Sequence, residues 1–290
     1  MKHILITGAN SYIGESLEKW LKKKPEEYSI ETLDMMDTNW QEKDFSMFDV
    51  VFHVAGIAHA DVGNVTEETK KLYYAVNRDL AVEVAKKAKK SGVKQFIFMS
   101  SMIVYSGCDT DYITNETIPT PFNFYGDSKW QADQEIRKIE TKEFKVVVLR
   151  PPMIYGKGSK GNYPQLAKLA IKLPVFPKVK NRRSMLHIDN LCEFIKLMID
   201  NEEHGIYFPQ NLEYTNTSNM VKYIATIKGH KIFLIPGTNW IVSILKKFPG
   251  KIGGLATKAF GNSVYELSMS EYKVNYRVHT LKESIEITEG

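Results

Sequence analysis

Short apolar runs alternate with longer amphipathic stretches along the first half of the chain. The apolar runs have the length of buried strands and lie at residues 2–7, 29–34, 49–55, 94–101 and 145–150. Between them, apolar residues recur at helical spacing near residues 12–24, 66–91 and 126–141. Because strands that alternate with helices form parallel sheets covered on both faces, the pattern predicts an α/β fold with a doubly wound parallel sheet.

The pattern becomes irregular after residue 155. Three glycines lie close together at positions 156, 158 and 161, as in a loop that faces a substrate or in an ordinary surface loop. Helical spacing predicts one further helix at residues 189–201, which we expect to pack back on the first domain. The chain therefore divides into a first domain of residues 1–155 and a smaller α/β lobe of residues 156–188 and 205–290.

The beginning of the chain has the pattern of a nucleotide-binding unit. The first strand runs into Gly8-Ala9-Asn10-Ser11-Tyr12-Ile13-Gly14 and then into a helix. Glycines in such a turn let the backbone approach a pyrophosphate, which then lies on the helix N-terminus. The alternative is that Gly8 and Gly14 only terminate and pack a turn. The strand before the turn and the helix after it favour the first interpretation, so residues 1–155 are predicted to bind a dinucleotide.

Asp34 indicates which dinucleotide this is. It ends the second strand about twenty residues after Gly14, where a carboxylate accepts hydrogen bonds from the adenosine ribose and repels a 2′-phosphate. The sequence therefore favours NAD. Met35 and Met36 leave room for a bulkier cofactor, so NADP stays possible.

A candidate for proton transfer lies in Tyr125-Gly126-Asp127-Ser128-Lys129. On a helix, Tyr125 and Lys129 lie one turn apart on the same face. An ammonium beside a phenol favours the phenolate, so we expect Lys129 to lower the pKa of Tyr125. Ser101, at the end of a predicted strand, could hydrogen-bond the same reacting oxygen. Together these groups can move a proton to or from a carbinol or carbonyl oxygen.

Taken together, these motifs resemble the extended short-chain dehydrogenase/reductase family, in particular its nucleotide-sugar epimerases, dehydratases and keto-reductases. Family members carry Thr-Gly-x-x-Gly-x-x-Gly, and here the middle glycine is replaced by Ser11. Further matches are residues 51–56, 74–77, 149–156 and 183–189. The resemblance implies a Rossmann fold. The stretch between Asp34 and Asp49 is shorter than in the family, so we expect the family's third strand to be very short or absent here.

The resemblance also assigns roles to residues. Ser101, Tyr125 and Lys129 match the catalytic set. The cofactor-binding positions are Gly8, Asn10, Ser11, Tyr12, Ile13, Gly14, Asp34, Ala55, Gly56, Asn77, Tyr125, Lys129 and Pro152. The substrate-binding positions are Ser101, Met102, Asn162 and Arg183, with Arg183 on the diphosphate of a nucleotide-sugar, and Arg182 is expected to point away from it. Members often form homodimers through the helices that carry Asn77 and Tyr125, and we expect a homodimer here.

The resemblance narrows the reaction. Sugar 4,6-dehydratases of this family carry two acids directly after the catalytic Ser or Thr, and here these positions are Met102 and Ile103. Neither transfers a proton, so we expect hydride chemistry at C4 only. A UDP-4-keto-6-deoxy-N-acetylhexosamine 4-reductase of cell-surface polysaccharide synthesis is favoured, because residues 160–163 and 181–184 resemble such reductases. A UDP-hexose or UDP-N-acetylhexosamine 4-epimerase is the alternative. A non-catalytic protein that senses the cofactor is a third hypothesis, disfavoured by the complete catalytic set.

Composition limits the other possibilities. The net charge of +5 comes from lysines scattered over helices, which predicts solvated helix faces and no nucleic-acid binding. The two cysteines are far apart, which indicates reduced thiols in a cytoplasmic protein and no metal site. His53 and His187 are expected to be structural. No apolar run reaches the ~18 residues of a membrane span. Residues 240–248 could pack as a lid or core segment or lie on a membrane surface.

Overall fold

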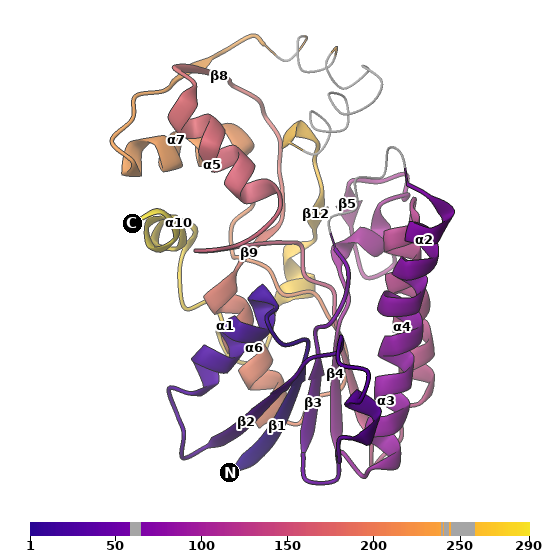
Figure 1. Ribbon diagram of the computed structural model, residues 1–290. Coiled ribbons are helices and arrows are strands. Elements are labelled where there is room, and N and C mark those ends of the chain that lie inside the picture. Colours follow the sequence, from indigo (N-terminus) through magenta and orange to yellow (C-terminus); the bar gives the residue numbers. More distant parts are fainter. Residues whose placement is uncertain (59–64, 239, 241–243, 245–258) are drawn as a thin grey trace.

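A parallel sheet of six strands forms the centre of the molecule (Figure 1). The computed structural model describes residues 1–58, 65–238, 240, 244 and 259–290. The strand order is β10-β6-β4-β3-β1-β2, and all pairs are parallel. The bounds are β1 (Lys2–Thr7), β2 (Tyr28–Leu33), β3 (Val50–His53), β4 (Gln95–Met99), β6 (Lys145–Leu149) and β10 (Gly205–Tyr207). The predicted fold class is thereby confirmed.

Helices cover both faces of this sheet, as Figure 1 shows. One face packs on α1 (Tyr12–Leu21) and α6 (Ile188–Asp200) through a core that includes Leu17, Leu191 and Ile195. The other packs on α3 (Ala81–Lys90) and α4 (Phe124–Lys138) through Ala85 and Ile136, among others. The helix predicted at 66–91 consists of α2 (Glu67–Tyr74), a π-helical turn η2 (Ala75–Leu80) and α3. The strands have apolar side chains on both faces because both faces are buried.

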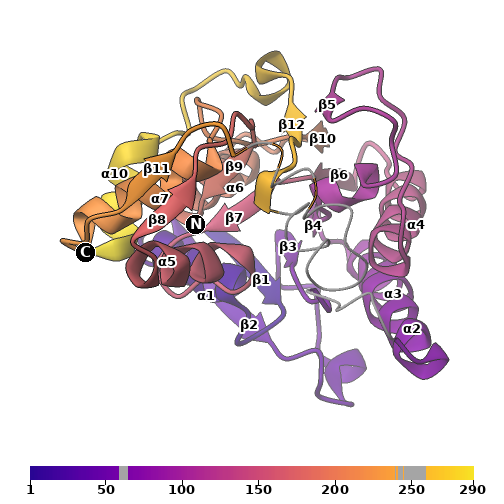
Figure 2. The ribbon, with the colours of Figure 1, turned by 90° about the horizontal axis from the view of Figure 1, so that it is seen from above.

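A smaller lobe lies above the carboxyl ends of the strands (Figures 1 and 2). Among the helices of its described residues are α5 (Asn162–Lys172), α7 (Thr217–Ile227) and α10 (Leu281–Glu289). Three two-stranded sheets join its parts: β7 (Met153–Tyr155) with β9 (Met185–His187), β8 (Val175–Pro177) with β11 (Phe233–Ile235), and β5 (Tyr112–Ile113) with β12 (Val264–Tyr265). Tyr155, Leu166, Met185 and Met220 belong to its separate apolar core.

Two parts of the fold differ from the simple division of the sequence. Residues 205–207, predicted to lie in the smaller lobe, form β10 and extend the central sheet by pairing with β6. Residues 34–49 contain no strand, and β2 is the edge of the sheet, as the short spacing predicted. Trp40 and Phe45 from this stretch are instead buried against the face that carries α3 and α4.

Two expectations concern membrane contact. Among the described residues, no helix has the length and apolar character that crossing a bilayer requires. Of the stretch 240–248, only Trp240 and Ile244 belong to the described residues, so the predicted lid or surface element lies outside them.

Short 3₁₀ turns complete the described chain: η1 (Trp40–Glu42), η3 (Met102–Tyr105) and η4 (Leu267–Ser270). The turn η3 begins after Ser100 and Ser101, which follow β4, and its Val104 and Tyr105 pack with Tyr265 and Met269. It therefore brings the segment after Ser101 to the boundary between the two parts of the molecule.

Candidate active site

A cavity of about 1250 Å³ lies at the carboxyl ends of the parallel strands. β1 pairs with β2 on one side and with β3 on the other, so the strand order reverses at β1, and such a point is where open α/β sheets bind ligands. Both parts of the molecule line the cavity. The lining includes Ser11, Tyr12, Ile13, Gly56, Ser101, Met102, Ile103, Tyr125, Lys129, Pro152, Asn162 and Arg183. The remaining predicted positions, Gly8, Asn10, Gly14, Asp34, Ala55 and Asn77, are outside this lining.

The glycine turn after β1 has a geometry that fits a pyrophosphate. Gly8 has φ +118°, and a Cβ there would lie 2.7 Å from the Ala55 nitrogen. A Cβ on Gly14 would lie 2.6 Å from Ser11 Oγ, so α1 packs closely on the turn. Ser11, which replaces the middle glycine of the family, has φ −82° and accepts a hydrogen bond from the Gly14 N–H at 3.1 Å. It is the N-cap of α1, and its conformation requires no glycine.

Tyr125 and Lys129 face the cavity from the first turns of α4. Asn123 caps this helix by accepting a hydrogen bond from the Gly126 N–H at 2.9 Å. The Lys129 ammonium donates to the Met99 carbonyl at 3.0 Å, at the end of β4. Ser101, in an extended conformation, accepts a hydrogen bond from the Ile103 N–H at 3.2 Å. The structure therefore brings the three predicted catalytic residues to one wall of the cavity.

The expected lowering of the Tyr125 pKa is wrong for this structure. Burial raises the pKa of Tyr125 to about 12, although the hydrogen bond with Ser101 opposes the shift. Burial also lowers the pKa of Lys129 to about 8. Desolvation therefore outweighs any attraction between the two groups, because both are enclosed and the ammonium is directed at a backbone carbonyl.

Asn77 connects the loop after β3 to the helix that carries Tyr125. Its side chain accepts a hydrogen bond from the Ile57 N–H at 2.8 Å and donates to the Ile57 carbonyl at 3.0 Å and to Ser128 Oγ at 3.3 Å. A Cβ on Gly56 would lie 2.9 Å from Asn77 Oδ1 and 3.0 Å from Lys129 Nζ. Asn77 and Gly56 thus set the distance between this loop and the Lys129 ammonium.

A buried ion pair behind the site was missed by sequence reasoning. Asp133 and Arg150 are 0% and 3% exposed, and Arg150 Nε donates to Asp133 at 2.8 Å. Arg137 donates to the same carboxylate at 2.8 Å. Arg150 also donates to the hydroxyl of Tyr105 at 2.7 Å, and Tyr105 lines the cavity. Asp133 lies one turn after Lys129 on the same helix, and this spacing could have indicated that the two side chains lie on the same helix face.

The two neighbouring arginines differ in their surroundings. Arg182 is exposed, whereas Arg183 is partly buried and lines the cavity. Burial lowers the pKa of Arg183 below its ordinary value. The adjoining wall contains Asn262 and Ser263, which sequence reasoning missed because no motif marks them.

Asp34 is exposed and accepts a hydrogen bond from the Met36 N–H at 2.9 Å. This contact caps the turn after β2. It leaves the second carboxylate oxygen available for a ribose.

The predicted structural histidines have different surroundings. His53 is fully buried, with Nδ1 2.7 Å from Thr7 Oγ1, while Nε2 has no partner among the described residues. Burial, together with the smaller effect of the positive charge of Lys129, lowers the pKa of His53 to about 3. His53 is therefore neutral in the folded chain.

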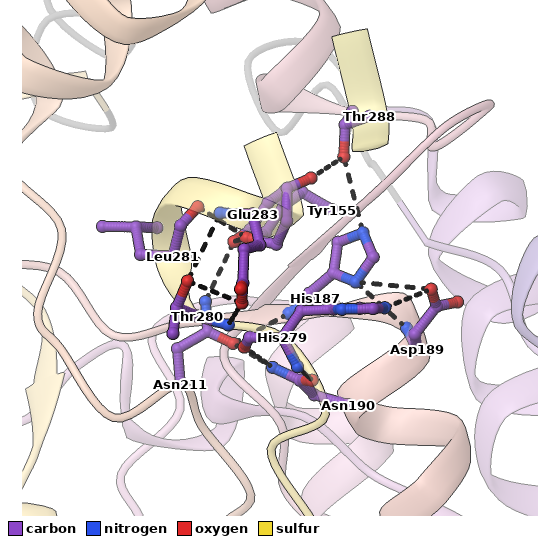
Figure 3. A network of polar contacts seen from close by, with 11 residues as sticks. Tyr155, His187, Asp189, Asn190, Asn211, His279, Thr280, Leu281, Glu283 and Thr288 are labelled. Atoms are coloured by element: carbon purple, nitrogen blue, oxygen red, sulfur yellow. Dashed lines mark hydrogen bonds and ion pairs between the residues drawn. The ribbon is translucent and has the colours of Figure 1, made fainter. Parts of the chain in front are cut away.

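His187 belongs to a polar network that joins α6 to the C-terminal segment (Figure 3). His187, Asp189 and His279 place three potential metal-ligand atoms within 4.8 Å of one another. Hydrogen bonds already account for these atoms, because His187 Nδ1 accepts from the Asp189 N–H at 3.3 Å and His279 Nε2 lies 3.1 Å from Asp189 Oδ2. The Thr288 hydroxyl donates a hydrogen bond to the Ser284 carbonyl at 2.6 Å, so its oxygen accepts a hydrogen bond from His187 Nε2–H. We interpret the network as structural.

Comparison with known proteins gives matches over most of the chain. The model of the family described as "NAD dependent epimerase/dehydratase family" matches residues 4–208, and that description agrees with the predicted nicotinamide cofactor. The UDP-glucose 4-epimerase of Vibrio cholerae is 29% identical over 86% of this chain and 83% of its own length. The N-acetyl-α-D-glucosaminyl-diphospho-ditrans,octacis-undecaprenol 4-epimerase of Escherichia coli O157:H7 is 28% identical over 86% and 81%.

Solved structures share the fold. A dTDP-4-dehydrorhamnose reductase from Clostridium acetobutylicum superposes with a TM-score of 0.76 at 21% identity, over 99% of this chain and 98% of that one. A UDP-glucuronic acid 4-epimerase from Bacillus cereus, solved with NAD, has a TM-score of 0.69 at 17% identity, over 99% and 97%. These likenesses establish the architecture.

Proposed function

Because the chain belongs to the NAD-dependent epimerase/dehydratase family, we propose that it inverts the configuration at C4 of a hexose or N-acetylhexosamine that is carried on a diphosphate. The observation that carries the proposal is that Ser101, Tyr125 and Lys129 line the same cavity as Arg183. The first three supply proton transfer at a sugar oxygen. A guanidinium supplies paired, charge-assisted hydrogen bonds to a diphosphate.

The glycine turn after β1 and the groups around the cavity would hold the cofactor. The N-terminus of α1, with Ser11, Tyr12 and Ile13 in the cavity wall, would hold the pyrophosphate. A nicotinamide held there would supply hydride transfer to and from C4. Lys129 would hold the ribose beside it. Asp34 would accept hydrogen bonds from the other ribose.

Tyr125 and Ser101 act on the C4 oxygen. Ser101 would hold this oxygen by a hydrogen bond, and the Tyr125 phenol would give it a proton or take one from it. With a pKa of about 12, Tyr125 is protonated at neutral pH before ligands bind. It is therefore ready to donate to a keto oxygen, and removal of a hydroxyl proton requires the bound ligands to lower this pKa.

The side chains after Ser101 argue against dehydration. Met102 and Ile103 both line the cavity, and neither can carry a proton. A dehydratase must protonate a leaving hydroxyl at a second carbon, whereas epimerisation and keto-reduction need proton transfer at one oxygen only. The lining therefore supports chemistry confined to C4.

Epimerisation is the better supported of the two C4 reactions. Two relatives that each match 86% of the chain are both named 4-epimerases, with UDP and with undecaprenyl diphosphate as carriers. The second candidate is a 4-keto-reductase, which the sequence favours. The protonated state of Tyr125 supports it, because the phenol can donate directly.

One assay distinguishes these reactions. The purified protein is incubated with N-acetylglucosamine and a 4-keto-6-deoxy-N-acetylhexosamine, each supplied on UDP and on polyprenyl diphosphate. NMR reports the configuration at C4, and absorbance reports NADH or NADPH. C4 inversion without net cofactor consumption supports the epimerase, and stoichiometric consumption supports the reductase. A protein that binds the cofactor and changes none of these sugars would contradict the proposal.

A further inference from the structure

A second cavity, of about 300 Å³, adjoins the main one at the end that holds Arg183. The two share Met153, Asn162 and Arg183 in their linings, so these side chains lie at the boundary between them. The walls of the second cavity come from α5, α7 and β9. Its apolar lining residues are Met153, Leu166, Leu169, Met185, Met220 and Ala259.

The polar groups of this second cavity are concentrated at the shared end. Arg183 and Thr215 are directly paired, with the Arg183 N–H donating to the Thr215 carbonyl at 2.9 Å and the Thr215 N–H donating back at 2.8 Å. Side chains of such a pair lie on one face, and both of these line the cavity. Thr215 is 2% exposed, and its hydroxyl has no partner among the described residues. The cavity is therefore lined by a cation and a buried hydroxyl, and both groups can bind a phosphate.

Beyond this end, few polar atoms are available to a ligand. The Thr217 hydroxyl donates to the Ala259 carbonyl at 2.6 Å and accepts from Asn181 at 2.9 Å. Gln165 and Lys168 are exposed and lie at the rim. A nucleoside would bury its base edge and its ribose hydroxyls against these apolar walls, which is costly without hydrogen bonds. An apolar chain has no such requirement.

The smaller lobe that contains this cavity also carries exposed apolar side chains. Leu169 lines the cavity and is 40% exposed. Strand β8, which follows α5 in the sequence, pairs with β11, and Val175 lies opposite Phe233. The alternate residues Phe176 and Leu234 are more deeply buried. The outward Val175, Phe233 and Ile235 are 44%, 68% and 42% exposed, where a small sheet ordinarily has polar residues. Exposed lysines at 172, 178 and 231 flank these strands.

We infer that the sugar-diphosphate substrate is linked to a polyprenol, with its diphosphate at Arg183 and Thr215 and its first isoprene units between α5 and α7. This inference rests on the proposed C4 activity and specifies its substrate class. The apolar face of β8 and β11, with its neighbouring lysines, is suited to the surface of a membrane with anionic lipids, from which such a substrate is drawn.

Competition between carriers tests the inference. The full-length protein is given N-acetylglucosaminyl-diphospho-polyprenol in detergent micelles or UDP-N-acetylglucosamine, and kcat/KM for C4 inversion is measured for each. We expect kcat/KM to be roughly 100-fold higher or more for the polyprenyl-linked sugar, because a pocket that leaves polar groups without hydrogen bonds discriminates strongly against the ligand that brings them there. Equal or better use of the UDP-linked sugar overturns the carrier inference and leaves the C4 activity standing. Turnover of neither substrate, with cofactor binding intact, removes both.

A matched pair of variants gives a second readout. Leu169→Gln places a polar group in the second cavity, and Ile171→Gln makes the same change on the same helix at a residue of similar exposure, 43%, that is outside the lining. We expect Leu169→Gln to lower kcat/KM for the polyprenyl-linked sugar roughly tenfold through KM, the scale of losing an apolar contact in a pocket. Ile171→Gln is expected to leave it unchanged. Equal effects from the two variants would argue against an apolar chain in this cavity.

Discussion

The buried carboxylate of Asp133 offers a quantitative test of how the site is held together. It is 0% exposed and accepts hydrogen bonds from Arg150, Arg137 and Ser100. Arg150 in turn donates to Tyr105 in the cavity wall. Asp133→Asn keeps the volume of the side chain and removes its charge, so the guanidinium of Arg150 stays buried without its counter-ion.

The loss of folding stability expected for Asp133→Asn follows from this burial. Removing one partner of a buried ion pair destabilises a protein by about 3–5 kcal/mol. Because an Asn carbonyl still accepts one of the hydrogen bonds, we expect a loss near the lower limit of about 3 kcal/mol. At about 2–4 °C per kcal/mol, the melting temperature should fall by about 6–12 °C.

Thermal and urea unfolding, followed by circular dichroism, measure this change. Glu135→Gln is the control, because Glu135 is two residues away on α4 and pairs with Lys138 at the exposed surface. It should unfold like the unmodified chain. If Asp133→Asn were no less stable than Glu135→Gln, the reasoning about this buried pair would be refuted.

Three further predictions address the cofactor, the substrate and the pH dependence. Asp34→Ala should weaken NAD binding and shift preference toward NADP in titrations with each cofactor, because the 2′-phosphate is no longer repelled; unchanged binding of both would leave Asp34 as a turn cap only. Arg183→Ala should raise KM for the sugar-diphosphate strongly and spare NAD binding, while exposed Arg182→Ala does less; equal effects would argue against the diphosphate site. The unfolding free energy should fall as pH drops from 6.5 toward 3, because burial lowers the pKa of His53 to about 3 and the unfolded chain binds more protons in that window. In His53→Phe the unfolding free energy should depend less steeply on pH. An unchanged pH dependence would contradict the conclusion that His53 is neutral in the folded chain.

The local motifs of the site could be predicted from the sequence. Gly8, Ser11 and Gly14 lie in one turn, and Tyr125 and Lys129 lie one helical turn apart, so neighbouring positions fix their geometry. The parallel sheet was equally predictable, because short apolar runs between amphipathic helices have few other arrangements.

Features that depend on distant parts of the chain were not predictable. Asp133 on α4 pairs with Arg150, which follows β6, and Thr215 joins the lining of the second cavity through its backbone pairing with Arg183. The raised pKa of Tyr125 is a result of burial, which spacing alone does not reveal. Each of these depends on which surfaces become enclosed when the two parts of the molecule pack together.

The central claim is that Tyr125 moves the proton at the C4 oxygen. The most direct measurement is kcat for C4 inversion in Tyr125→Phe, with Tyr73→Phe as the control, because Tyr73 packs edge-on against Tyr125 at a ring distance of 6.0 Å and is outside the cavity lining. We predict a fall of roughly 10²–10⁴-fold for Tyr125→Phe, with cofactor affinity unchanged. Tyr73→Phe should retain its rate. Near-full turnover by Tyr125→Phe would contradict the account.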